Sequence, residues 1–497
     1  MNQKRRWVSL LLAAALLLSL LPTMVFAVGN TAIYTDMNYK GQEDGTQSKP
    51  YSNFETAVAQ AQDGDTIVIK GKAFANVREE SGVSPLVIDK RVTITGENDA
   101  VGELYVRAGG IILGADVIMT NVELNLANKY HNAIYVNGYK FTATNVTRGS
   151  GSREVHLYAG GIGEETQVKT ELPASGTNAV LNLTNSTFGD IFAAGVLKDF
   201  VGDVIITAIG SNLGNVYASG TSDREPDGNW FDTSEPAAPD ANAWYIVDGA
   251  VSVTTDGSSI TNVNAMGNSK VTVTVNNALE SRMLTLHGAR ALIVNGGTAT
   301  LAEVEPNTVV TVSGNASLDL SRLTSPTLGS LTGDGTLVLG KAQTLSITDT
   351  FDGTWAFETV NGFNSKSGVA EYSHTYITAG SGNATVSFQP HDTQSGMTLD
   401  KTGNAWKTSS APEIPEVVLT FAIDGATSKT LAVDAIGYED SYIPIQWTSP
   451  AVSPDNASLT AIPFRYVVTY NGREYAATSV RDTEKRYAAE ISLGNKY

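Results

Sequence analysis

A repeat with a fixed offset constrains the fold of this chain more than any other feature. Residues 178–195 align with residues 203–220 at an offset of 25, and a third copy, residues 250–267, follows at an offset of 47. The copies share their glycine and apolar positions, so that Ile191, for example, falls on Val216. Copies with the same inward positions can stack, because every apolar side chain then lies above its equivalent. The repeat therefore predicts a coil of stacked strands.

The turn position of each copy holds only residues that tolerate a positive φ. Asn185 falls on Gly210 and then on Gly257. Earlier in the chain, Thr-Asn-Val occurs at Asn121 and again at Asn145, 24 residues later, which is about one turn of such a coil. Asparagine accepts the left-handed conformation of a tight turn, and stacked asparagines can hydrogen-bond to one another. We therefore assign these asparagines a structural role.

One amphipathic helix is predicted near the N-terminus, at about residues 52–62. Its apolar residues recur at helical spacing on one face: Phe54, Ala57, Val58 and Ala61. Gly64 is free to adopt a left-handed cap, and the β-branched strand Thr66–Ile69 follows at once. A short helix with one apolar face needs a surface to cover, and the open end of a strand coil is such a surface.

This segment, with Ile33–Asp36 and the polar loop 41–49 before it, resembles the N-terminal cap and first rung of right-handed parallel β-helix proteins of the pectate-lyase superfamily. The resemblance implies an all-β protein in which residues 28–410 form a right-handed, single-stranded parallel β-helix with an N-terminal capping helix. In that superfamily the same cap occurs on lyases, hydrolases, phage spikes and adhesins, so it does not specify the chemistry. In character the chain is closest to adhesin-like bacterial surface proteins.

The two ends of the chain differ from the coil. Residues 1–27 have the basic start, apolar run and small residues before a cleavage site that are typical of a signal peptide, which predicts a secreted or cell-surface protein. No later stretch has the 18 or so apolar residues of a membrane span. Residues 411–416 contain two prolines and are predicted to be a linker. Residues 417–497 resemble an immunoglobulin-like or fibronectin type III β-sandwich, with a hairpin signal at Asn471-Gly472.

Charge and cysteine content exclude several classes of function. Removal of residues 1–27 leaves 33 − 3 = 30 basic against 51 acidic residues, a net charge of −21. Nucleic acids and anionic membranes favour a basic surface, so neither is an expected partner. The simplest interpretation of the acids is a solvated surface. The chain has no cysteine, which excludes disulfides, thiolate metal sites and thiol nucleophiles.

The best candidate for a binding site is an insertion, Thr221–Asp248, which accounts for the longer offset of the third copy. Long loops on a rigid repeat are frequent sites of function. Among the aromatic residues of the insertion, Trp230, Phe231 and Trp244 suit a glycan ligand. It is also rich in acids, which makes Ca²⁺ a conceivable cofactor, although the spacing of the acids matches no known calcium loop. The prediction therefore includes no metal site.

A second candidate is an aromatic column formed by Tyr158, Phe192 and Tyr217, which share one position in the repeat. Because side chains alternate along a strand, Phe192 points outward if Ile191 points inward. An exposed aromatic stripe suits sugar rings, whereas packing under a neighbouring loop is the structural alternative. Both interpretations stay open at the level of sequence.

Three functions are compatible with these features, and we assign no catalytic residue. The first is a non-catalytic, adhesin-like protein that binds polysaccharides or the glycans of glycoproteins. The second is a polysaccharide lyase or glycoside hydrolase acting on an acidic polysaccharide, although the motifs of those enzymes are not found and the five histidines are scattered. The third is a structural segment of a surface assembly. Ligand, anchoring and oligomeric state stay open.

Overall fold

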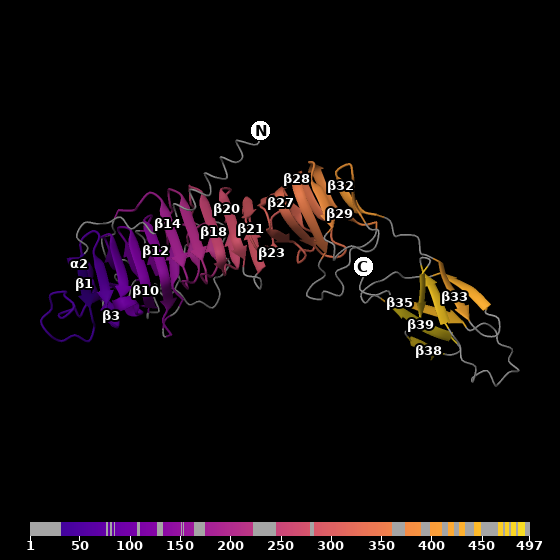
Figure 1. The fold of residues 1–497 in the computed structure, drawn as a ribbon. Helices are drawn as coiled ribbons and strands as arrows, with labels where there is room; N and C mark the ends of the chain where they lie inside the picture. The colour runs from indigo at the N-terminus through magenta and orange to yellow at the C-terminus, as the bar shows by residue number, and fades with distance from the viewer. Residues whose placement is uncertain are drawn as a thin grey trace. The chain divides into compact units, whose positions relative to one another are not determined.

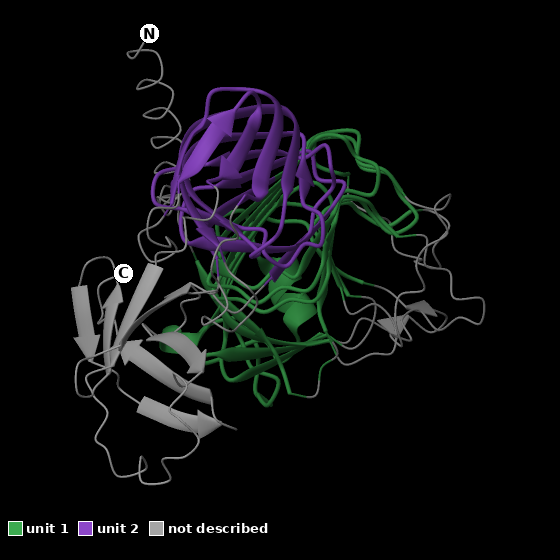
Figure 2. Cartoon of the chain, turned by 90° about the vertical axis from the view of Figure 1, so that its right-hand side faces the viewer, with its two compact units in different colours: residues 1–272 green, residues 273–497 purple. Residues whose placement is uncertain are grey.

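The computed structural model describes residues 31–75, 85–106, 110–126, 133–150, 152, 154–163, 174–221, 245–278, 283–359, 373–388 and 398–409, and elsewhere only the backbone of several strands. The protein is all-β, with a long succession of parallel strands and a β-helix-like repeat (Figure 1). It divides into two compact units, residues 1–272 and 273–497 (Figure 2). The predicted signal peptide lies outside the described residues.

The first unit contains the strands of the sequence repeat, and their pairing confirms the predicted offsets. Strands β14, β16 and β18 pair in parallel, with Ala179 opposite Val204 and Val204 opposite Val251. A second stack pairs Ile191 with Val216 and Val216 with Val263. The strands of this unit are β1 (Ala32–Thr35), β2 (Thr66–Ile69), β3 (Lys72–Ala75), β4 (Arg78–Glu79), β5 (Gly82–Val83), β6 (Leu86–Ile88), β7 (Val92–Gly96), β8 (Gly102–Val106), β9 (Ile111–Leu113), β10 (Val117–Leu126), β11 (Ala133–Tyr135), β12 (Lys140–Arg148), β13 (His156–Tyr158), β14 (Ala179–Thr184), β15 (Ile191–Phe192), β16 (Val204–Ile209), β17 (Val216–Tyr217), β18 (Val251–Ser258) and β19 (Asn262–Asn264), with a short 3₁₀ helix at Glu97–Asp99.

The predicted turn positions are confirmed by their backbone angles. Asn121 and Asn145 both have φ of 54°, and the Asn145 side-chain amide donates to the Asn121 side-chain oxygen at 2.9 Å. Asn185, Gly210 and Gly257 have φ of 47°, 57° and 58°. Asn121 lies within one continuous strand, β10, so the predicted turn is a local bend inside a strand.

Buried serines form a second ladder next to this turn, which the sequence analysis did not identify. The backbone N–H of Ser186 donates to Ser211 Oγ at 3.1 Å, and that of Ser211 donates to Ser258 Oγ at 3.0 Å. Each hydroxyl also donates to the carbonyl two residues before it in its own rung. A buried hydroxyl is tolerated only when it is hydrogen-bonded, so these serines lock each turn to the next.

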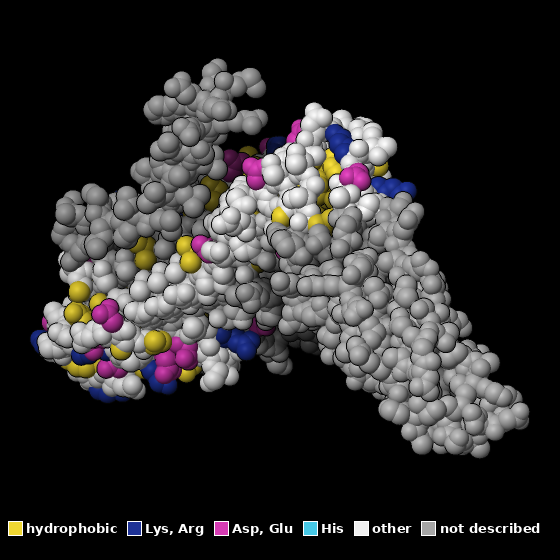
Figure 3. Space-filling view, turned by 45° about the vertical axis from the view of Figure 1, so that its right-hand side comes forward, with side chains coloured by type: hydrophobic (Ala, Val, Ile, Leu, Met, Phe, Trp, Pro, Cys, Tyr) yellow, Lys and Arg dark blue, Asp and Glu magenta, His cyan; other side chains and the backbone are white. Residues whose placement is uncertain are grey.

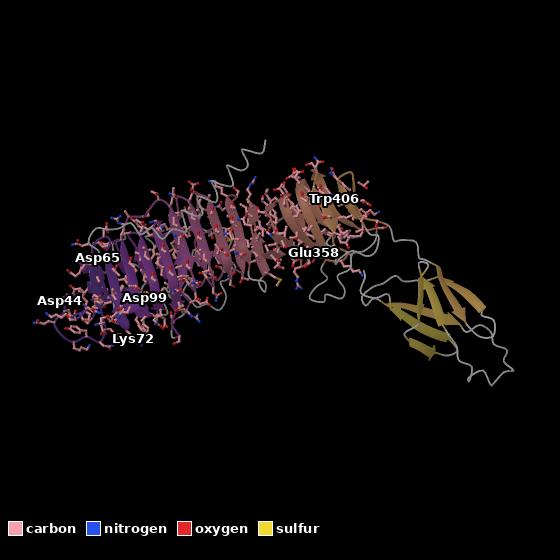
Figure 4. The ribbon with its side chains drawn as sticks, viewed as in Figure 1. Asp44, Asp65, Lys72, Asp99, Glu358 and Trp406 are labelled. Atoms are coloured by element: carbon pink, nitrogen blue, oxygen red, sulfur yellow. The ribbon has the colours of Figure 1, made fainter. Side chains whose placement is uncertain are left out.

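The predicted N-terminal helix is present as α2 (Phe54–Gln60), shorter than the predicted range. Asn53 caps it by accepting from the Glu55 N–H at 2.8 Å, and Phe54, Ala57 and Val58 are buried. Beyond the helix, the Asp65 carboxylate accepts from the backbone N–H groups of Thr31 and Gln62 at 3.0 and 2.8 Å (Figure 4). Helix and first strands are thereby held together at this end of the unit.

The rungs of the second unit are shorter than those of the first. Ala291 pairs with Val309, and Leu331 pairs with Phe351, so the partners are closer in sequence than those of the repeat in the first unit. The strands here are β21 (Met283–His287), β22 (Ala291–Val294), β23 (Thr298–Glu303), β24 (Val309–Val312), β25 (Ser317–Asp319), β26 (Thr327–Leu328), β27 (Ser330–Leu339), β28 (Leu345–Thr359), β29 (Thr375–Ser381), β30 (Thr385–Phe388), β31 (Leu399–Thr402) and β32 (Ala405–Thr408); β20 (Val271–Ala278) crosses the boundary between the units. The sequence analysis did not predict this shorter period.

Parallel pairing ends at an antiparallel hairpin. Strand β32 pairs antiparallel with β29 on one side and with β31 on the other. Several large aromatic side chains are buried here, namely Phe351, Trp355, Phe357, Tyr376 and Trp406. The hairpin thus covers one edge of β29.

The C-terminal residues contain seven strands in two antiparallel sheets, described by their backbone alone. One sheet has the order β34-β33-β36-β37 and the other β35-β39-β38. Tyr470 pairs with Arg473, which confirms the predicted hairpin. The strands are β33 (Glu416–Phe421), β34 (Thr427–Ala432), β35 (Tyr442–Thr448), β36 (Tyr466–Tyr470), β37 (Arg473–Ala476), β38 (Ser479–Thr483) and β39 (Arg486–Ser492).

Candidate functional site

The predicted aromatic column is a continuous stack of rings in the first unit, and it begins one rung earlier than predicted. Tyr135 on β11 stacks on Tyr158 with ring centroids 5.2 Å apart. Tyr158 stacks on Phe192 at 4.7 Å, and Phe192 on Tyr217 at 5.1 Å. The rings are nearly parallel, with interplanar angles of 20°, 11° and 11°. We call these four side chains the aromatic ladder.

Alternation along the strands places the ladder outside the coil, as the sequence predicted. Ile191 and Val216 are fully buried, whereas Phe192 and Tyr217 are partly exposed. Tyr158 is only 1% exposed, because Ile162 and Val196 pack over it together with Tyr135. Each interpretation therefore holds for part of the column. Tyr158 is packed under neighbouring segments, whereas Phe192 and Tyr217 reach the surface.

Stacking limits what the ladder can offer to a ligand. Sugars contact aromatic residues mainly through the ring face, and each inner ring of the ladder already covers the faces of its neighbours. The outer face of Tyr217 meets the next rung, where Asn264 is its partner in register. Phe192 and Tyr217 therefore present ring edges and the Tyr217 hydroxyl to solvent rather than open faces.

A polar column runs beside the ladder, two residues before the ladder residue in each rung. The Asp190 N–H donates to His156 Nδ1 at 3.0 Å, and Asp190 Oδ1 accepts from the backbone N–H and the side-chain amide of Asn215 at 2.7 and 3.2 Å. Asn262 follows in register. Asp190, Asn215 and Asn262 share one position of the repeat at the predicted offsets. The sequence analysis did not identify them as a column, because the position mixes an acid with amides and His156 lies on a rung of another length. They supply fixed hydrogen-bonding groups along one edge of the ladder.

Burial controls the protonation of this region. It lowers the pKa of His156, and the carboxylates of Asp190 and Glu154 oppose this effect only in part. Burial also raises the pKa of the Tyr217 phenol, with a smaller contribution from Asp190. Both side chains are therefore neutral at neutral pH. Since His156 Nδ1 accepts a hydrogen bond, the ring proton resides on Nε2.

The lowered pKa of His156 predicts a loss of stability on mild acidification. Unfolded histidine titrates near pH 6.5. The neutral His156 ring makes its full contribution to the free energy of unfolding above that pH. Below it, the contribution decreases by at most about 1.4 kcal/mol per pH unit, until the pH passes the pKa of the folded state. His156→Asn keeps an acceptor at the Nδ1 position but does not titrate. Melting temperatures measured between pH 7.5 and 5 should therefore decline less in this variant than in the wild type.

The appropriate control is His287→Asn, since His287 is partly exposed and pairs with Glu303 at 3.3 Å. Equal pH dependence of the wild type and His156→Asn would show that His156 is not the group whose burial destabilises the acidified protein.

The insertion leaves the coil from the last rung of the ladder. Trp230, Phe231 and Trp244 lie outside the described residues, but both ends of the insertion are described. The Gly220 N–H donates to the Tyr245 carbonyl at 2.8 Å, and Ser219 forms an antiparallel bridge with Ile246. The predicted insertion is shortened at its C-terminal end, because Val247 already pairs with Phe200 in the coil. We call the paired residues 219–221 and 245–246 the neck.

The neck touches the aromatic ladder. The hydroxyl groups of Tyr158 and Thr221 lie 3.5 Å apart, and Thr221 is the last described residue before the insertion. The described ends of the insertion therefore lie next to the ladder, which the sequence predicted separately as ligand-binding. We call the ladder, the polar column and the neck the flank.

A separate pair of carboxylates was missed by the sequence analysis. Glu103 on β8 and Glu123 on β10 are partners in register, and Lys72 Nζ lies 2.8 Å from Glu103 Oε2 (Figure 4). The Lys72 ammonium and the Tyr105 hydroxyl lower the pKa of Glu103. The two glutamates are closer in sequence than one period of the repeat, so no pattern of the sequence marks them as neighbours. The group is partly exposed and contains two carboxylates, and in the described part of the chain no three His, Asp or Glu side chains are grouped to hold a metal ion.

Comparison with known proteins provides no further assignment. Within the described residues, no helix is both long and apolar enough to cross a membrane. The chain matches no protein-family model, no curated protein and no solved structure.

Proposed function

We propose that this protein is a secreted or cell-surface, adhesin-like protein that binds glycans at the flank and does not catalyse a reaction on them. Its scaffold in this proposal is a right-handed, single-stranded parallel β-helix like those of the pectate-lyase superfamily. Helix α2 acts as the cap of its N-terminal end, and the C-terminal sheets act as an immunoglobulin-like module. The predicted signal peptide supports export, and the proposal requires no cofactor.

The observation that carries the proposal is the position of the neck on the aromatic ladder. A rigid stack of rungs fixes the ladder and the polar column, and the insertion with Trp230, Phe231 and Trp244 starts from the same place. Glycan sites combine aromatic faces with fixed polar groups that recognise hydroxyls. The ladder lacks open faces, so in this proposal the insertion supplies them, while Asp190, Asn215 and the Tyr217 hydroxyl supply hydrogen bonds.

Binding to an immobilised panel of glycans tests this function. We expect the mature protein to bind at least one glycan, and Trp230→Ala and Trp244→Ala each to weaken that binding by about 30-fold, the effect of losing roughly 2 kcal/mol at an aromatic anchor. Tyr105→Ala is the control, because Tyr105 is a partly exposed aromatic residue on another stack of strands. It should leave affinity unchanged.

Two outcomes would contradict the proposal. Wild-type protein that binds no glycan of the panel would remove the function. Binding that survives both tryptophan substitutions would remove the insertion from the site. Release of shortened or unsaturated oligosaccharides from any bound polymer would instead favour the enzymatic alternative.

A further inference from the structure

The flank is poor in groups that could receive an anion. Apart from Arg148, Lys198 and Lys270, the charged side chains described around it are acidic: Glu154, Asp190, Asp199, Asp203 and Asp248. Arg148 already lies 3.9 Å from Glu154, and Lys270 Nζ donates to the Asp248 carbonyl at 2.7 Å.

Backbone N–H groups, the other common receptors for anions, are already occupied by these same carboxylates. Asp190 Oδ1 accepts from Asn215 N at 2.7 Å, as described above. Asp199 Oδ1 accepts from Ile246 N at 2.8 Å, at the neck itself, and Asp203 Oδ1 accepts from Ala250 N at 2.8 Å. At three successive places around the insertion, an aspartate side chain of one rung therefore accepts a hydrogen bond from a backbone N–H of the next rung. At each of these places, an incoming carboxylate or sulfate would be repelled by the aspartate and would find the backbone N–H already hydrogen-bonded.

The remaining polar groups suit uncharged ligands. The Tyr217 phenol is a neutral donor, and Asn215, Asn262 and Asn264 provide amides along the same edge. Carboxylates such as Asp190 accept hydrogen bonds from sugar hydroxyls or from an ammonium group. Much of the described surface in Figure 3 is likewise made of uncharged side chains and backbone.

From these observations we infer that the flank selects glycans by charge: its ligand is a glycan without carboxylate or sulfate groups, and a glycan that carries free amines is favoured over one that carries acids. This inference rests on the proposed glycan-binding function and specifies its ligand class. It differs from the expectation of an acidic polysaccharide as substrate. Repulsion between like charges is stronger near a protein surface than in water, and it can decide between otherwise equal ligands.

The inference is tested with pairs of polymers that share a backbone and differ in charge. Suitable pairs are methyl-esterified and de-esterified homogalacturonan, hydroxyethyl and carboxymethyl cellulose, and N-acetylated and deacetylated chitosan. For each pair that shows binding at 20 mM NaCl, we expect the member with the more positive net charge to bind at least about tenfold more tightly. This member is the uncharged polymer in the first two pairs and the deacetylated polymer in the chitosan pair. The difference should shrink at 500 mM NaCl, because the Debye length falls from roughly 20 Å to a few ångströms.

The double variant Asp199→Asn with Asp248→Asn removes two charges beside the neck while keeping polar side chains. It should reduce the discrimination against carboxymethyl cellulose and de-esterified homogalacturonan at low salt at least threefold. Asp116→Asn is the matched control, because Asp116 Oδ1 accepts from Lys140 N at 2.9 Å in the same manner on other rungs. It should leave the discrimination unchanged.

The possible results separate the two proposals. Tighter binding of the anionic members would overturn the charge selection and leave the glycan-binding function standing. Discrimination that is the same in the double variant and in Asp116→Asn would show that the acids at the neck do not cause it, which also overturns the inference. Absence of binding to every polymer would overturn the glycan-binding function, and the charge selection with it.

Discussion

Gly353→Ala is expected to lower the free energy of unfolding of the second unit by about 3 kcal/mol or more. Gly353 lies within β28 and has φ of 114°, a sparsely populated region that costs a non-glycine residue about 1–3 kcal/mol. Its partner in register is Gly333, with φ of 113°. A Cβ at position 353 would overlap with the Gly333 carbonyl oxygen, so the two rungs would have to separate. Thermal and urea unfolding of the purified variant measure the effect.

Gly314→Ala separates the two causes of this loss. Gly314 also has a positive φ, 63°, but a Cβ added there would meet no atom within 4 Å. Its substitution should therefore cost only the conformational strain of about 1–2 kcal/mol. If Gly353→Ala is no more destabilising than Gly314→Ala, close approach of the rungs does not contribute, and our account of the glycine pair is wrong.

Trp406→Ala is expected to destabilise the end of the same unit by about 3–5 kcal/mol, the usual cost of truncating a buried large aromatic residue. Trp406 lies on β32 and is 1% exposed (Figure 4). Its ring packs edge-on against Phe351 with centroids 4.9 Å apart, and Lys401 Nζ lies 5.0 Å from its centroid on the other strand of the hairpin. Loss of the ring would leave a cavity beneath the hairpin that covers one edge of β29.

Melting temperature and the concentration dependence of light scattering report on this change. Weakening of the hairpin uncovers the edge of β29, and an uncovered strand edge promotes association, so the variant should also aggregate at lower temperature. Lys407→Ala, an exposed neighbour on the same strand, should stay within about 0.5 kcal/mol of the wild type. A Trp406 variant as stable as the lysine variant would mean that the hairpin does not depend on this ring.

The sequence predicted the fold best where the rungs have one length. In the first unit, the predicted offsets appear unchanged in the register of β14, β16 and β18. In the second unit the offset changes from rung to rung, since Ala291 pairs with Val309, Thr298 with Ser317 and Val309 with Ser330. No single offset aligns these rungs, and their strands were predicted without their partners.

The serine ladder was missed for a different reason. Ser186, Ser211 and Ser258 occupy one position of the repeat at the predicted offsets, but a serine after a turn is common and does not by itself indicate a hydrogen bond from rung to rung.

The candidate site was predictable in part for a related reason. Phe192 and Tyr217 occupy one position of the regular repeat, which identified both of them and their outward direction. Tyr158 was assigned to the same column, and Tyr135 was missed. The burial of both depends on the segments around Ile162 and Val196, which alternation along a strand cannot predict. The polar column was missed because its position mixes an acid, amides and a histidine. Sequence patterns thus indicate which side chains face outward but not what covers them.

The neck has a consequence for how such a protein can change. The ends of the insertion are joined to each other by the hydrogen bond between Gly220 and Tyr245, and the rungs before and after it keep their pairing, with Val204 opposite Val251. The coil therefore accommodates the whole insertion without a shift of register. Because its two ends are hydrogen-bonded to each other, the insertion can be replaced by another sequence without disturbing the rungs. Recombination or design can therefore change the insertion and keep the scaffold that carries it.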